Sequence, residues 1–504
     1  MERAVPMGGP GGVVTSQSPP FTVPMRYMLL GMAGFVLFGI DLAVQSFHLG
    51  AGGAFLPAVV ALTHLLTLGS LLSFIMGAVY QLATVAFLIP IASERGARWN
   101  FWLYLVAVTG LIVSMGLWSG PGLMFFGTLA TVSLYVYAIV IIVSVSRSKV
   151  RGPMLWFVIS AHVYLMIAIL AAWLMIAGIA GVAPGLGNVY EQLLGTHILL
   201  AVGGFFTFLV MGFSFKLLPM FTLSHGFPTW RQKWTFGLAH AAVCLIFLGI
   251  WLHAGTAPGA GGVPSGGASH GGLSAIGSAL EGIGGIAGVA AFGSQLFDIR
   301  DIFRKRLRKK TEPPMRAVVV AAVGGIVGVL LVLLQLAVRH GQDGWQAVVT
   351  FYLLGWVVLT LMGYAYKIVP FLIWTERYSA KAGRSPASGA GGSPGASRGS
   401  AAGAAAGARR NAAARGAADA GVDAGAKRER IPVIADLIQL ERARPVLYGF
   451  AAGVVVLAAS SAVEFGIGAV VGSLVITVCI LWFVWQLGRV VDPKRVAKEL
   501  SGRD

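Results

Sequence analysis

Long apolar stretches, separated by short polar or glycine-rich segments, recur along the whole chain of 504 residues. A helix of about 20 apolar residues is long enough to cross the hydrocarbon core of a bilayer. The pattern therefore predicts an all-α integral membrane protein with about 12 transmembrane helices, which we number as spans one to twelve. The spans are expected at residues 25–46, 54–90, 99–118, 121–146, 153–180, 189–221, 233–254, 272–297, 315–338, 345–375, 446–464 and 466–490.

The segments outside the spans complete the predicted domain organisation. The insertion after span ten consists mainly of Ala, Gly, Ser and Arg, and it has too few apolar side chains to offset the entropy lost on ordering, so we expect it to be disordered. The helix that follows it has an apolar face and is expected to lie on the membrane surface. The predicted organisation is a cytoplasmic tail at 1–24, spans one to ten within 25–375, a cytoplasmic insertion at 376–430, an interfacial amphipathic helix at 431–445, spans eleven and twelve within 446–490, and a basic tail at 491–504.

Composition agrees with a polytopic membrane protein, since 57% of the residues are hydrophobic and only 11% are charged. A soluble domain would carry about twice that share of charge. The formal net charge is +18, but Lys and Arg gather in alternate loops, as at Arg147, Lys149 and Arg151. This positive-inside distribution excludes a nucleic-acid partner and predicts a bacterial-type plasma membrane location with both termini cytoplasmic. The basic run Arg304–Lys310 is interpreted as topogenic, with contact to anionic lipid as the alternative.

A glycine motif recurs in spans two, six and ten. Two glycines eight residues apart are followed, four residues after the second, by Gln or Lys with an aromatic residue before it. The copies contain Gly69, Gly77 and Gln81, then Gly204, Gly212 and Lys216, then Gly355, Gly363 and Lys367. An internal repeat at a spacing of four helices predicts three pseudo-symmetric four-helix units, each offering an equivalent helix to a common interior. Small residues at those positions allow a helix or a flat ligand to approach the backbone.

Histidines accompany the first two copies of the motif. His64 lies thirteen residues before Gly77, and His197 lies fifteen residues before Gly212, whereas the third copy has Thr350 and Val348 at these positions. Both histidines are expected in the outer half of the membrane and level with each other. Imidazole is the usual ligand for haem iron and copper inside membranes. An interhelical hydrogen bond to Ser or Thr is the alternative, and the sequence leaves both open.

This layout resembles the haem–copper oxidase subunit I superfamily, which includes cytochrome oxidases and nitric oxide reductases. The NnrS-like membrane proteins of nitric oxide metabolism are a second resemblance. The likeness covers the membrane body but not residues 379–427. The resemblance implies that His64 ligates a low-spin haem and that His197 ligates an active-site copper.

Several ligands of that superfamily are missing from this chain. Span seven has only His240 and His253, near its two ends, where the superfamily has a histidine pair. No histidine follows residue 340, so span ten has no axial ligands, and Ala201 replaces the tyrosine one turn after the copper ligand. An oxygen-reducing dinuclear centre is therefore not expected.

The sequence hypothesis is a divergent oxidase-fold protein that binds one haem or copper and takes part in respiratory or nitric oxide metabolism. The alternative is a cofactor-free membrane transporter or assembly factor that retains the scaffold. Enzymatic activity stays open, as does a contribution of ligands from additional membrane subunits.

Three carboxylates complete the set of candidate residues. Glu281 in span eight, Glu191 at the mouth of span six and Asp41 in span one are candidates for a proton relay or an acidic ligand shell. The alternative for Glu191 and Asp41 is a solvated interfacial carboxylate. A buried Glu281 is expected to be neutral or paired.

Overall fold

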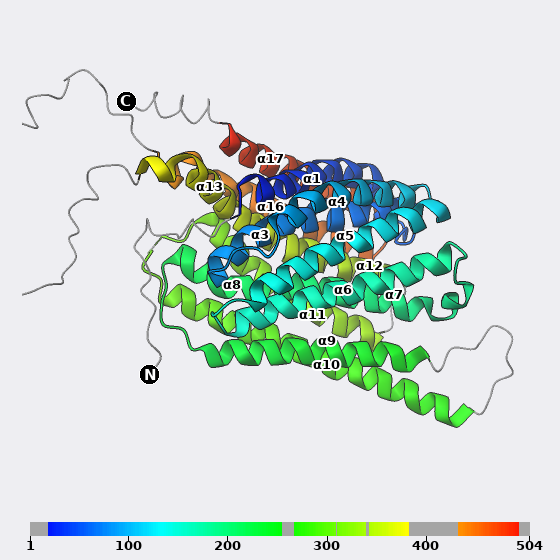
Figure 1. The fold of residues 1–504 in the computed structure, drawn as a ribbon. Coiled ribbons are helices and arrows are strands. Elements are labelled where there is room, and N and C mark those ends of the chain that lie inside the picture. The colour runs from blue at the N-terminus through cyan, green and yellow to red at the C-terminus, as the bar shows by residue number, and fades with distance from the viewer. Residues whose placement is uncertain (1–18, 255–266, 309, 339–341, 383–431, 493–504) are drawn as a thin grey trace, which may run out of the picture.

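The computed structural model describes most of the membrane body (Figure 1). The described residues are 19–254, 267–308, 310–338, 342–382 and 432–492. Most residues of the predicted N-terminal tail, disordered insertion and basic C-terminal tail lie outside these ranges.

Twelve helices in the described ranges are long and apolar enough to cross a membrane, and those ranges contain no strand, which confirms the predicted fold class. Three of the spans are built from consecutive α and π segments, and one of these three begins with a 3-10 turn. The span elements are α1 (Thr22–Leu49), α2 (Pro57–His64), η2 (Leu65–Leu72), α3 (Ser73–Phe87), α4 (Glu94–Gly116), α5 (Gly120–Ser146), α6 (Pro153–Ile179), η3 (Pro184–Val189), α7 (Tyr190–Ile198), η4 (Leu199–Phe206), α8 (Thr207–Thr222), α9 (Thr229–Ala254), α10 (Gly267–Arg304), α11 (Pro313–Val338), α12 (Gln342–Phe351), η5 (Tyr352–Val358), α13 (Leu359–Ala382), α16 (Ala443–Ala462) and α17 (Gly466–Val491).

The helices form a closed ring around the three spans that carry the glycine motif. Neighbouring helices pack in the order α1, α4, α5, α6, α9, α10, α11, α16 and α17, and α17 returns to α1. The last helix of each four-helix unit therefore packs against the first helix of the next. The motif-bearing spans lie inside this ring, and we call them the central spans (α2–η2–α3, α7–η4–α8 and α12–η5–α13).

The motif glycines set the distance between each central span and the first helix of its own unit. A Cβ atom added at Gly77 would lie 2.7 Å from Met28 Cγ on α1, and one added at Gly212 would lie 2.7 Å from Phe157 Cβ on α6. The third copy behaves in the same way, since a Cβ at Gly363 would lie 2.7 Å from Val318 Cγ2 on α11. Here the small residues permit close approach of helices.

Each central span changes from α to π geometry at the same place in the motif. The π segments η2, η4 and η5 contain the first motif glycine of each copy. Hydroxyl groups reach back five residues within these segments, as Ser70 Oγ does to Leu65 O at 2.9 Å and Thr207 Oγ1 does to Val202 O at 2.8 Å. These bonds satisfy carbonyls in the widened turns. Segments of this kind are frequent at functional sites.

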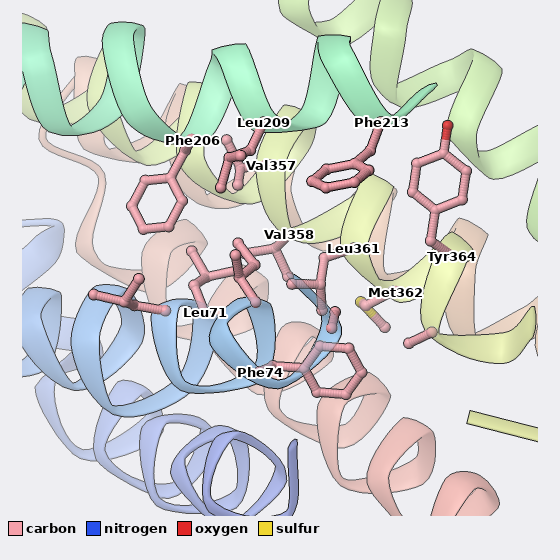
Figure 2. Close-up of a cluster of buried hydrophobic side chains, with 14 of the residues drawn as sticks. Leu71, Phe74, Phe206, Leu209, Phe213, Val357, Val358, Leu361, Met362 and Tyr364 are labelled. Carbon is pink, nitrogen blue, oxygen red and sulfur yellow. The ribbon is translucent and has the colours of Figure 1, made fainter. Parts of the chain in front are cut away.

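The central spans converge from the ends of their π segments onward, as predicted. Figure 2 shows apolar side chains of all three pointing toward one another. The cluster includes Leu71 and Phe74 from the first central span, Phe206, Leu209 and Phe213 from the second, and Val357, Val358, Leu361 and Met362 from the third. Two hydrogen bonds join the second and third central spans here, between Thr207 and Tyr352 at 2.8 Å and from Tyr364 to Ser214 at 2.7 Å.

The bond between Thr207 and Tyr352 gives a measurable test of this convergence. We expect Thr207→Val and Tyr352→Phe to destabilise the folded protein and to show a coupling energy of about 0.5–1 kcal/mol, as typical hydrogen bonds between membrane helices do. The measurement is a double-mutant cycle of unfolding in detergent. Strictly additive effects of the two substitutions would contradict the contact.

One end of the bundle, which we call the basic end, contains Arg147, Arg231 and Arg316. We call the opposite end, with His64, His197 and His253, the histidine end. At the basic end Arg231 forms ion pairs with Asp298 at 3.2 Å and Asp301 at 2.8 Å.

Several basic side chains at this end make contacts within the protein. Lys367, the last residue of the third motif copy, pairs with Glu312. Within the basic run, Lys305 donates to Gly226 O, and Arg308 pairs with Glu312 at 2.9 Å. Glu312 lies in the connection from α10 to α11 and pairs with both Arg308 and Lys367.

The interfacial helix predicted at 431–445 is wrong in extent. The described part of this segment forms only two short turns, α15 (Ile434–Leu437) and η7 (Leu440–Arg442), and α16 already begins at Ala443. The Asp436 carboxylate accepts a hydrogen bond from Val433 N, and the Pro432 carbonyl accepts one from Trp374 Nε1, so local contacts fold the chain back against α13. The predicted end of span ten is also too early, because α13 continues to Ala382.

Candidate functional site

His64 and His197 face each other between the first two units. Their ring centres are 6.2 Å apart and the ring planes lie within 11° of parallel. His64 is the last residue of α2, directly before η2, and His197 lies in the last turn of α7, directly before η4. The predicted placement of the two imidazoles at one level is therefore confirmed.

Each ring is oriented by a hydrogen bond from Nδ1 to a backbone carbonyl. His64 Nδ1 lies 2.8 Å from Val60 O on its own helix, and His197 Nδ1 lies 3.0 Å from Ala168 O on α6. Because a carbonyl oxygen only accepts, Nδ1 is the protonated nitrogen in both rings. The neutral rings then present Nε2 as a lone-pair donor, which is the tautomer that a metal requires. The partners are carbonyls and not Ser or Thr hydroxyls, but the bond from His197 crosses to α6, so the alternative of an interhelical hydrogen bond holds for His197 with a different acceptor.

The elements α2, α7 and α12 at the histidine end pack chiefly against helices of their own units, whereas α8 and α13 contact each other directly. Both histidines are half-buried, as are Leu68, Val202 and Thr350 on the three central spans. The two rings are therefore partly accessible and are not sealed in the core.

The separation of the rings suits one metal ion held from two sides. Two bonds of about 2 Å from a metal to imidazole nitrogens, together with the size of the rings, place the ring centres about 6 Å apart. The observed 6.2 Å agrees with this value, which also falls within the range of ordinary ring packing. The described residues contain no cluster of three or more His, Cys, Asp or Glu side chains arranged to hold a metal. Protein ligation at this place would therefore come from the two histidines.

The three candidate carboxylates do not hydrogen bond or ion pair with one another. Glu281 is buried and lies near His253 on α9, with 3.5 Å between Oε1 and Nε2. Asp41 accepts a hydrogen bond from Gln45 at 3.3 Å, and Glu191 is exposed. The expectation that Glu281 is paired is confirmed, while a relay through all three residues receives no support from their contacts.

The other intramembrane histidines are engaged in hydrogen bonds. His162 contacts Tyr137 Oη through Nε2 at 3.2 Å, and His240 Nδ1 lies 2.7 Å from Tyr164 Oη. Sequence reasoning missed the Ala168 carbonyl that orients His197, because no sequence pattern identifies a particular backbone acceptor on another helix. It also missed the pairing of His253 with Glu281, although both residues were placed at the histidine end of adjacent spans.

Fold and contacts thus define the chain as a multi-pass helical membrane protein with a pair of facing imidazoles inside it. Comparison with protein-family models and with curated proteins finds no match for this chain. The function must be inferred from the residues themselves.

Proposed function

We propose that this protein holds one redox-active metal cofactor, a haem iron or a copper ion, between His64 and His197. The observation that carries the proposal is the parallel, 6.2 Å arrangement of two imidazoles whose Nδ1 atoms are both tied to carbonyls. Metal-binding histidines in proteins characteristically donate their second ring nitrogen in this way.

The protein's own residues hold and orient such a group. The carbonyls of Val60 and Ala168 fix both rings in the tautomer that exposes Nε2. The π segments beside them set the two rings at one level on neighbouring units. Bound there, a haem or copper ion would supply a one-electron redox centre within the bilayer.

The resemblance to the haem–copper oxidases supports a role in respiratory or nitric oxide metabolism. Three units whose second helices converge, with histidines on the first two of these helices, agree with that scaffold. The proposed location is a plasma membrane with the basic end toward the cytoplasm, because Lys and Arg outside the spans favour that side. Additional membrane subunits and anionic lipid at the basic end belong to the same proposal.

Purified protein tests the proposal directly. We expect one haem or one copper per chain, recognised by metal analysis together with a reduced-minus-oxidised visible spectrum. Haem would give a Soret band and sharp bands on reduction, whereas copper without haem would appear only in the metal analysis or as a weak oxidised-state spectrum. A colourless preparation that remains metal-free after growth with added haem precursor and copper would overturn the proposal.

A cofactor-free transporter or assembly factor is the second candidate. The supporting observation is that the described residues offer no third conventional metal ligand in a cluster with the histidines. In that case the partly accessible interior beside His64 and His197 would serve a transported or guided molecule. The metal analysis distinguishes the two functions.

A further inference from the structure

A second polar group lies at the histidine end, between α9 and α10. His253 on α9 has its Nε2 atom 3.5 Å from Glu281 Oε1 and its Nδ1 atom 3.3 Å from Ser274 Oγ, both on α10. The Glu281 side chain is 12% exposed and that of His253 is 31% exposed. The Glu281 carboxylate is thus nearly enclosed within the helix pair, while the imidazole beside it is partly exposed.

Two glycines make room for this pair in a reciprocal way. A Cβ atom added at Gly249 on α9 would lie 2.5 Å from Glu281 Cγ, and one added at Gly277 on α10 would lie 3.1 Å from His253 Nε2. Each helix therefore has a glycine opposite the polar side chain of the other. Close packing of α9 on α10 and the position of the His–Glu pair depend on the same residues.

The distance between His253 and Glu281 is compatible with a shared metal ion as well as with a shared proton. Charge-assisted hydrogen bonds between nitrogen and a carboxylate are about 2.7–2.9 Å long. The observed 3.5 Å is longer, and it equals the nitrogen–oxygen separation expected when both atoms bind one metal at about 2.1 Å with a nearly tetrahedral angle. Ser274 on Nδ1 is suited to orient the ring so that Nε2 faces the ion.

We propose that His253 and Glu281 bind one divalent transition-metal ion of the zinc and copper class, with Ser274 positioning the imidazole. One nitrogen and one carboxylate oxygen are ligands that these ions accept, and water completes the coordination. The ion would also neutralise a carboxylate that is costly to bury unpaired. The site borders the surface of the bundle at His253, whose side chain is partly exposed.

This site is separate from the His64/His197 pair but adjoins the same central span. Trp251, two residues before His253, donates from Nε1 to Thr196 Oγ1 at 3.0 Å, and Thr196 directly precedes His197. The segment that presents His253 is therefore anchored beside the proposed cofactor site. The proposal does not depend on a cofactor at His64 and His197.

Cobalt(II) is the probe that tests this site, because its visible d–d spectrum reports coordination. We titrate Co²⁺ into full-length protein in detergent at neutral pH and then displace it with Zn²⁺. The expected result is one saturable Co²⁺ site with a nitrogen ligand and four- or five-coordinate absorption. His253→Gln and Glu281→Gln should each weaken the affinity at least tenfold, and Ser274→Ala should weaken it about tenfold through the orientation of the ring.

Matched variants separate the sites and the folding effects. His48→Ala, at an exposed histidine of the same end, should leave the titration unchanged. Co²⁺ bound at His253 and Glu281 should persist in the double variant His64→Ala/His197→Ala, which removes any Co²⁺ that the other pair takes up. Size-exclusion chromatography checks that each variant elutes at the same volume as the unmodified protein and has kept its fold. Absence of a saturable site in the unmodified protein would overturn the proposal, as would Co²⁺ binding that survives both His253→Gln and Glu281→Gln. A His253 ring that titrates with pH but gives no metal spectrum would identify a proton-sharing pair and would also overturn it.

Discussion

His64→Ala and His197→Ala are each expected to remove the metal cofactor completely, because the proposed site places both imidazoles on the same ion. Residues that only hydrogen bond to a metal ligand contribute about 10- to 100-fold to metal affinity. Loss of one of the two ligands themselves should lower the affinity by far more, so neither variant should retain metal through purification. The measurement is haem or copper per chain, with the visible spectrum, for each variant beside unmodified protein and His48→Ala.

The superfamily resemblance makes a different prediction, which the same experiment separates. If His64 held a haem and His197 held a copper ion, each variant would lose one metal and keep the other. A ring separation of 6.2 Å is too short for two metals with independent ligand sets between the rings. Selective loss of a single metal from a two-metal protein would contradict the shared site.

Chemical rescue distinguishes ligation from a structural role of the histidines. His64→Gly leaves space where the ring was, and added imidazole can enter this space because the position is only half-buried. We expect imidazole to restore the spectrum of His64→Gly, while Ala168 O and Val60 O keep their places. A variant that folds normally but cannot be rescued, and that also retains its metal, would exclude His64 as a ligand.

The sequence predicted the features that depend on length and repetition. Hydrophobic length located all twelve spans to within a few residues at most ends, and the exceptions, such as α10 and α13, are helices that continue into polar sequence at the basic end. The spacing of the motif glycines predicted that three spans share one interior. The first two central spans each end at a leucine in the left-handed backbone conformation, Leu88 and Leu223. Each leucine lies eleven residues after the second motif glycine, so the repeat extends beyond the residues used to find it.

Features that depend on three-dimensional contacts were not predictable. The π segments arise from how each central span fits its neighbours, and the apolar residues within them are the same as in an ordinary helix. The level of His64 and His197 followed from the repeat, but the carbonyls that choose their tautomer belong to the backbone, which carries no residue-specific signal. Glu281 was recognised as a residue in need of a partner, and only the packing of α9 on α10 identified His253 as that partner.

Gly34→Ala is expected to be among the most destabilising small substitutions in the first unit. A Cβ atom at Gly34 on α1 would overlap the carbonyl group of Gly69 in η2 and lie 2.9 Å from Ser70 N, and backbone atoms cannot move aside as a flexible side chain can. The helices must separate, at a cost of about 3 kcal/mol. Gly39→Ala on the same helix is the matched control, since its Cβ would make ordinary contacts of 3.6–3.8 Å with α17 and should gain the usual helix propensity.

Thermal unfolding of the two variants in detergent measures this difference, and the metal content connects it to function. Because η2 begins directly after His64, displacement of Gly69 should also move the His64 ring away from His197. We therefore expect Gly34→Ala to lower both the unfolding temperature and the metal content, and Gly39→Ala to lower neither. Equal stability of the two variants would show that α1 does not meet the first π segment at its glycine. Lower stability of Gly34→Ala with full metal content would show instead that the ring pair is held independently of that contact.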